Sequence, residues 1–117
     1  MDLQYLREYC LSKKGVSEAL PFDESTLVFK VAGKIFVLTN IDTFDAINLK
    51  CDPELVTELR EHYEAVVPGY HMNKKHWNTI KMHAGLPSKL ILQWVDHSYE
   101  MVIKGLSKKE RESFIEE

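Results

Sequence analysis

Over several stretches of this 117-residue chain, apolar residues recur at intervals of three and four, the spacing required for one buried helix face. The second stretch has the clearest start, because Asp52 suits a helix cap and Pro53 fits the first helical position. The pattern predicts four helices: about residues 2–14, from Asp52 onward, from Pro87 to Gly105, and a short one that starts at a capping box, Ser107 with Glu110.

Between these helices apolar and polar residues alternate, which is the period of a strand with one buried face. Three segments follow it: residues 26–31, 44–51 and 77–82. Residues 34–39 are apolar on both faces, which predicts a central strand, and residues 65–67 predict a short one. Segments 26–31 and 34–39 flank Ala32-Gly33, so we expect a hairpin there. The element order, αβββαββα with a small C-terminal addition, predicts one α+β domain over residues 1–117. Its antiparallel five-stranded sheet would carry helices on one face and leave the other solvated or free to meet a partner.

The composition is that of an ordinary globular domain, with 44% hydrophobic and 28% charged residues. No apolar run approaches the ~20 residues of a membrane span, and the N-terminus lacks a signal-peptide pattern. We therefore expect a cytoplasmic monomer with no membrane partner. Cys10 and Cys51 are far apart and lack CxxC spacing, so we expect buried free thiols rather than a disulfide.

Charge is distributed unevenly along the chain. Between Ala65 and Val95 there is no acidic residue, and the segment carries +4 from Lys74, Lys75, Lys81 and Lys89. The remainder holds 11 basic and 18 acidic residues and so carries −7. Such asymmetry indicates an anionic partner for the basic segment. Because the whole chain is weakly acidic at −3, we expect only a local patch to meet nucleic acid.

The centre of this segment, from Pro68 to Asn78, mixes lysines with ring and amide side chains. Lysines there would contact phosphates and the rings would stack on bases, a mixture typical of single-strand binders. The asparagines would read a base edge or hold the loop. Lysines at the predicted hairpin and at the end of the third strand would extend the patch. The candidate nucleic-acid-binding residues are Lys34, Lys50, Tyr70, His71, Asn73, Lys74, Lys75, His76, Trp77 and Asn78.

Five motifs are spread across almost the whole chain: Pro21-Phe22, the hairpin Val28–Lys34, the run Asn48–Pro53, the block Pro68–Asn78 (PGYHMNKKHWN) and Asp96–Tyr99. This set resembles the MmcQ/YjbR family. The resemblance implies a bacterial cytosolic protein with an α+β fold similar to frataxin-like and secretion-chaperone-like domains. It also brings a DNA-binding label, which the family carries on shape analogy. The family has no established activity or cofactor, so the resemblance carries over no catalytic residue, and we expect a non-enzymatic protein without a cofactor.

The same residues also fit alternative roles. Trp77 could pack against the sheet, and two adjacent lysines are often a solvated edge. A protein-interaction module of the chaperone type predicts an exposed apolar patch on the sheet face and capture that is insensitive to salt. A small-molecule or metal-binding protein predicts a concave pocket where a small set of side chains converges: Tyr70, His71, His76 and Cys51. The interval between His71 and His76 suits zinc, although no cysteine or acid is near in sequence.

The sequence offers little support for catalysis. Asp96-His97-Ser98 contains the residue types of a hydrolase triad, but neighbours on a helix point in different directions. Asp96 and His97 fall on the polar face of the long predicted helix, where solvation is expected, although His97 could bond the sheet or a loop instead. Cys51 precedes a helix N-terminus, which can lower a thiol pKa, but its place in the alternation favours a core cysteine.

Overall fold

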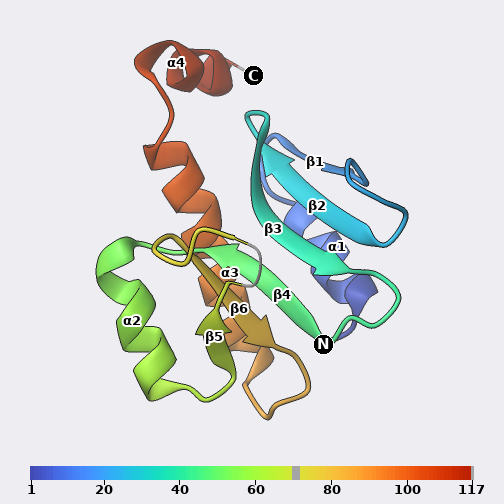
Figure 1. Ribbon diagram of the computed structural model, residues 1–117. Helices are drawn as coiled ribbons and strands as arrows, with labels where there is room; N and C mark the ends of the chain where they lie inside the picture. The colour runs from blue at the N-terminus through green and yellow to red at the C-terminus, as the bar shows by residue number, and fades with distance from the viewer. Residues whose placement is uncertain (70–71, 117) are drawn as a thin grey trace.

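The structure, a computed structural model, describes residues 1–69 and 72–116 (Figure 1). Within them the helices are α1 (Leu3–Leu11), α2 (Pro53–His62), α3 (Ser88–Lys104) and α4 (Lys108–Glu116). The strands are β1 (Val16–Ala19), β2 (Thr26–Val31), β3 (Lys34–Asn40), β4 (Ala46–Lys50), β5 (Val66–Pro68) and β6 (Trp77–Lys81). No helix in the described residues combines the length and apolar character needed to cross a bilayer.

The six strands form one antiparallel sheet in the order β1-β2-β3-β4-β6-β5. Figure 1 shows α1 and α3 behind this sheet, while α2 packs beside β5 and β6. The strand register places Val37 beside Leu49 and Ile47 beside Ile80, and these side chains are buried against the helices. We call this side the core face. The opposite side, the open face, carries Leu38, Asn48 and Thr79, which the register places side by side on adjacent strands.

The prediction of an α+β domain with an antiparallel sheet is confirmed, but the prediction of five strands and the order αβββαββα is wrong. The missed strand is β1, a four-residue edge strand of intermediate and exposed residues. Its core-facing position beside Phe29 is taken by Glu18, so the apolar alternation that marks a strand is absent. The likeness to frataxin-like and secretion-chaperone-like domains stays a prediction.

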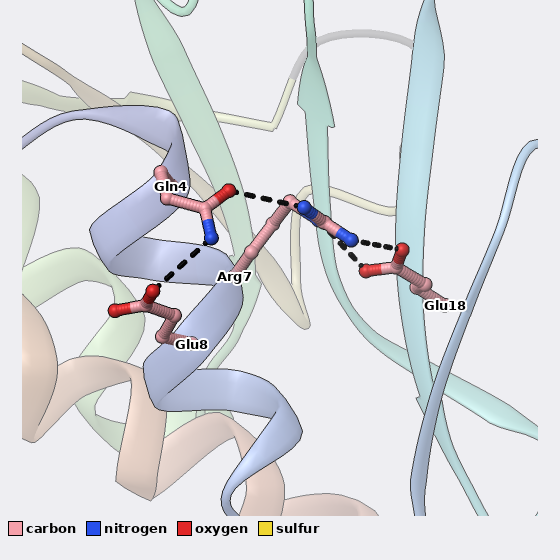
Figure 2. Close-up of polar contacts among 4 residues, drawn as sticks. All are labelled: Gln4, Arg7, Glu8 and Glu18. Atoms are coloured by element: carbon pink, nitrogen blue, oxygen red, sulfur yellow. Dashed lines mark hydrogen bonds and ion pairs between the residues drawn. The ribbon is translucent and has the colours of Figure 1, made fainter.

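A salt bridge explains how a carboxylate is accommodated on the core side of β1. Arg7 of α1 donates two hydrogen bonds to Glu18, from Nε to Oε2 at 2.9 Å and from Nη2 to Oε1 at 2.5 Å (Figure 2). Gln4 accepts a third from Arg7 at 3.0 Å and donates its own amide to Glu8 at 3.1 Å. A paired, fork-shaped contact of this kind fixes geometry as well as charge, and it holds the edge strand to α1.

Helix boundaries follow the capping residues. Asp2 caps α1 and Asp52 caps α2, each accepting a backbone N–H, as the sequence predicts for the second. The predicted capping box is also confirmed, because Ser107 and Glu110 exchange hydrogen bonds at 3.1 and 3.0 Å. The first helix ends at Leu11 rather than at residue 14, and the turn that follows uses Gly15 at a φ of 72°.

Both cysteines are buried free thiols, as expected. Desolvation raises the pKa of Cys10 to about 12 and that of Cys51 to about 11. Buried, protonated thiols are poor nucleophiles. The proximity of Cys51 to the start of α2 therefore does not activate it, and its assignment to the core is correct.

We expect the free energy of unfolding to be steady up to pH 9 and to fall above it. The thiol pKa is raised on folding from an ordinary value of 9.0, so the unfolded chain releases these protons first. The stabilising contribution is complete below pH 9.0 and is lost as the pH rises toward the folded values of about 12 and 11. Urea unfolding of the wild type and of a Cys10→Ala/Cys51→Ala variant between pH 8 and pH 11 tests this. An equally steep decline in both proteins would contradict it.

Candidate functional site

The segment between β5 and β6, residues 69–76, is here called the basic loop; Tyr70 and His71 lie outside the described residues. Asn73 organises its second half, because its side-chain oxygen accepts the Lys75 N–H at 2.9 Å and its carbonyl accepts the Trp77 N–H at 3.0 Å. The carbonyl of His76 accepts the Cys51 N–H at 2.7 Å, which ties the loop to the end of β4. In Figure 1 the described part of the loop, residues 72–76, lies at the end of β4.

Arg60 of α2 holds the base of this loop. Its Nε donates to Oδ1 of Asn78 at 2.7 Å, and its Nη2 donates to the carbonyls of Trp77, at 3.2 Å, and of Lys74. Asn78 is 1% exposed and donates its amide to the carbonyl of Val56 at 3.3 Å. Of the two roles predicted for Asn78, holding the loop therefore fits the structure. No sequence signal pointed to Arg60, because a basic residue in the last turn of a helix is ordinarily explained by the helix dipole.

A second constraint on the basic loop comes from Gly69. A Cβ built on this buried glycine would lie 3.0 Å from both Cβ and the carbonyl oxygen of Trp77. The backbone at Gly69 and strand β6 thus approach each other so closely that a side chain at this position would force its neighbours to shift. This close approach fixes the direction in which the basic loop leaves the sheet.

We expect Gly69→Ala to lower the free energy of unfolding by about 1–2 kcal/mol, because the added methyl forces the two backbones apart. Gly105→Ala is the matched control, since its Cβ would meet its nearest atoms at an ordinary 3.5 Å and its φ is −80°. The control should be neutral or stabilise by up to about 1 kcal/mol. Urea denaturation of both variants measures the difference, and equal stabilities would refute the close-approach argument.

The structure gathers some of the predicted lysines and separates one from them. Lys50 lies opposite Trp77 on the open face, at the strand end to which the basic loop is tied. Lys74 and Lys75 are exposed on the loop, and the Lys74 ammonium also donates to the Gly69 carbonyl at 3.4 Å. Within residues 1–69 and 72–116, no carboxylate lies within 4.0 Å of these three ammonium groups.

Lys34 is the lysine that the structure separates from the others. It sits at the β2–β3 turn, where its ammonium lies 3.7 Å from the Glu110 carboxylate of α4. Figure 1 shows this turn beside α4 and away from the basic loop. The expectation that Lys34 extends the loop patch is therefore not met. The hairpin was visible in the sequence, but α4 was not predicted to cover its tip.

The open face also contains a groove of about 640 Å³, here called the sheet groove. Its lining residues are Phe22, Thr26, Ile35, Leu38, Thr39, Asn40, Asp45, Ala46, Asn48, Met72 and Thr79. Met72 belongs to the basic loop, so the loop forms one wall of the groove. Phe22, on the loop before β2, is 66% exposed. A concave pocket was predicted by the small-molecule alternative, but Cys51 and His76 are not among its lining residues.

Asn48 and Thr79 are two of the polar residues that line this groove. The Thr79 hydroxyl donates to Oδ1 of Asn48 at 2.5 Å, and Nδ2 of Asn48 donates to the Leu38 carbonyl at 3.5 Å. The sequence placed Asn48 on the face opposite the core, which is correct. It could not show that neighbouring strands bring Leu38 and Thr79 to either side of it.

Asp96 and His97 of α3 make structural contacts, which corrects the expectation of solvation for Asp96, while His97 bonds the backbone before α2, as the alternative for this residue predicts. Asp96 accepts from the Tyr9 hydroxyl at 2.7 Å and pairs with the Lys13 ammonium at 2.5 Å. The bond to Asp96 helps raise the pKa of Tyr9 to about 12. His97 accepts the Asp52 N–H at 3.1 Å through Nε2. Ser98 bonds to the sheet, so the three neighbours turn to different partners and form no triad.

Among the described residues, no group of three or more His, Cys, Asp or Glu side chains is arranged to hold a metal ion. The proposed zinc pair includes His71, which lies outside those residues. Cys51 is buried in the core and Asp52 caps α2. Recruiting either residue as a metal ligand would therefore disturb the fold.

Comparison with known proteins identifies relatives along the full chain. The family model described as YjbR matches residues 11–101. An Escherichia coli K12 protein named "Uncharacterized protein YjbR" is 30% identical over 99% of both chains, and "Uncharacterized protein YbdF" of E. coli O157:H7 is 34% identical over 95% of both. A crystal structure of Deinococcus radiodurans protein DR2400, with the family domain DUF419, superimposes with a TM-score of 0.89 at 38% identity, covering 97% of this chain and 87% of that one.

Proposed function

Given that the chain belongs to the YjbR family, whose members named above carry no stated activity, we propose from its own surface that it binds nucleic acid without catalysing a reaction. The observation that carries the proposal is the cluster of lysine ammonium groups at the basic loop. Lys74 and Lys75 lie on the basic loop, which a backbone hydrogen bond ties to the end of β4. That strand end carries Lys50, paired with the half-buried Trp77. Cations beside an aromatic ring are the combination that single-strand binders use.

Electrostatics favours an anion at this place despite the overall charge of −3. The described lysines of the loop have no carboxylate within 4.0 Å, so their charge stays available. Arg60 adds to it, because its guanidinium bonds carbonyl and amide oxygens and, among the described residues, no carboxylate within 4.0 Å. A local patch of this kind attracts phosphates at short range, while the acidic remainder limits affinity at long range.

The alternative of a protein-interaction module has its own supporting feature. Leu20 and Phe22, on the segment between β1 and β2, are 47% and 66% exposed, and Phe22 lines the sheet groove, where an apolar segment of another protein would find a contact. Binding driven by such contacts would persist in high salt, whereas binding through Lys74 and Lys75 weakens as salt rises. Salt dependence therefore separates the two functions.

The test is fluorescence anisotropy with labelled single- and double-stranded DNA between 50 and 200 mM salt. We expect Lys74→Ala/Lys75→Ala to weaken single-strand binding about tenfold and to reduce the slope of log K against log salt by about 1.4, since each lost phosphate contact removes ~0.7. Lys108→Ala/Lys109→Ala on α4 is the matched control, with the same loss of two exposed adjacent lysines. Equal weakening by both variants, or no binding by the wild type at low salt, would refute the proposal.

A further inference from the structure

We infer that the sheet groove accepts a single unstacked base, so that the partner of this protein is single-stranded rather than double-stranded nucleic acid. This inference rests on the proposed function and assigns a role to the groove, which the lysines alone leave unexplained. The link between the two is Met72, because the loop that presents Lys74 and Lys75 also supplies a wall of the groove. A strand held at the loop therefore lies next to an apolar cavity.

The size and lining of the groove suit a planar ring. Its volume of about 640 Å³ is within the range of sites for small organic groups. Ile35 and Leu38 contribute aliphatic side chains to its lining, and Phe22 and Met72 contribute an aromatic ring and a thioether. An exposed phenylalanine beside a pocket is a stacking partner, and every base has an aromatic face to stack on it. A methionine thioether also contacts rings favourably.

Asn48 lines the groove and offers hydrogen-bonding groups to a base. Its amide has two N–H donors and an oxygen with two lone pairs. Within the described residues, one donor goes to the Leu38 carbonyl and one lone pair accepts the Thr79 hydroxyl. One donor and one lone pair are left on the same amide. Adjacent donor and acceptor atoms complement the edge of a base, as an asparagine does when it pairs with adenine.

The charges at the two ends of the groove give the ligand a direction. Lys50 lies two residues beyond Asn48 on the same face, about 7 Å along the strand. Lys30 is paired with Ile35 at that end as well. At the other end Asp45 lines the groove, and Asp23 and Asp42 hold the adjoining turns by accepting hydrogen bonds. A nucleotide therefore fits with its base at Asn48 and its phosphate toward Lys50 and the basic loop.

A base within a duplex is stacked and paired, so it enters such a groove only after it has been extruded, which costs several kcal/mol. In a single strand this cost is largely absent. The same surface should therefore discriminate between the two forms. Lysines alone would not favour the single strand, because a duplex carries more phosphates. A preference for the single strand is therefore the effect expected of the groove.

Three labelled ligands test the inference on the whole protein by anisotropy at low salt: a single strand of mixed sequence, its duplex, and an abasic strand of equal length and charge. We expect the wild type to bind the single strand at least about fivefold more tightly than the abasic strand, the gain from one stacked base. Ala46→Phe places a ring in the groove and should remove this difference while leaving abasic binding unchanged. Ser17→Phe, on the same face but outside the groove, is the control and should behave as the wild type.

The outcomes separate the two proposals. If the abasic strand or the duplex binds as tightly as the single strand and Lys74→Ala/Lys75→Ala still weakens binding, the groove takes no base, and the inference is wrong while the proposed function stands. If none of the three ligands binds, the proposed function is wrong and the inference falls with it. A wild type that binds the abasic strand or the duplex as tightly as the single strand overturns the inference without any variant, so the inference stays falsifiable even if Ala46→Phe does not fold.

Discussion

Arg60→Ala is expected to lower the free energy of unfolding by about 2–4 kcal/mol, the largest effect we predict for a residue outside the apolar core. The guanidinium is the shared donor for the Asn78 side chain and for two carbonyls at the start of β6 and in the basic loop. Its removal leaves the buried Oδ1 of Asn78 without its partner and frees the loop from α2. Hydrogen bonds to charged groups in partly buried places are among the costliest to lose.

The measurement is urea denaturation together with amide hydrogen exchange. The exchange of loop amides, such as those of Lys75 and Trp77, should accelerate in Arg60→Ala, because the turn at Asn73 loses its support. Arg111→Ala is the matched control, since Arg111 is exposed and donates to one carbonyl, that of Lys104, at 3.1 Å. The control should change stability by less than about 0.5 kcal/mol. If both variants lose stability equally, Arg60 has no special role.

Ser98→Ala is expected to cost about 2–3 kcal/mol although it removes a single atom. Ser98 is fully buried on α3, where its hydroxyl donates to the Phe36 carbonyl at 2.5 Å and accepts the Lys50 N–H at 2.9 Å. Pairing between β3 and β4 stops at Val37 and Leu49, and Phe36 has no partner in the register of β2. The hydroxyl therefore bridges two strands where their own ladder has ended.

Alanine at this position leaves a buried N–H and a buried carbonyl unsatisfied, which is why the cost exceeds that of an ordinary surface hydrogen bond. Ser113→Ala, on the exposed side of α4, serves as the control and should be nearly neutral. Chemical denaturation gives the free energies. Because Ser98 positions the end of β4 that carries Lys50, weaker binding of DNA should accompany the loss of stability. A change below about 0.5 kcal/mol for Ser98→Ala would show that the two strands pair well without it.

Local signals in the sequence were enough to predict most elements. The Asp52-Pro53 start of α2, the capping box at Ser107 and the alternation of Ile47 and Leu49 in β4 are each set by residues within a few positions of one another. Capping and alternation depend on residues that are close together in the chain, so both can be recognised in the sequence. Strand β1 was not predicted, because its core-facing Glu18 breaks the apolar alternation. This glutamate is stabilised there by hydrogen bonds from Arg7 of α1, which the local sequence does not reveal.

The candidate site was predictable in part. The interval without acidic residues located the basic loop, and the structure brings Lys50 to the same end of the sheet. Charge along a chain does not reveal which distant side chains will lie beside it. Lys34 pairs with Glu110, and Asp96 pairs with Lys13, and each ion pair joins residues more than 70 positions apart in the chain. The anchoring role of Arg60 and the sheet groove had no counterpart in the sequence pattern.

By itself, the sequence determined the class of the fold, the starts of its helices, the buried faces of its central strands and the place of the basic loop. The tertiary structure alone decided that Arg60 and Ser98 bond backbone groups where strands stop pairing and that Glu110 reaches Lys34. It also decided that a methionine of the basic loop lines the same groove as Asn48. The reason is range: periodicity and capping depend on neighbours in the chain, whereas a cavity or a shared hydrogen-bond donor depends on how separate elements pack.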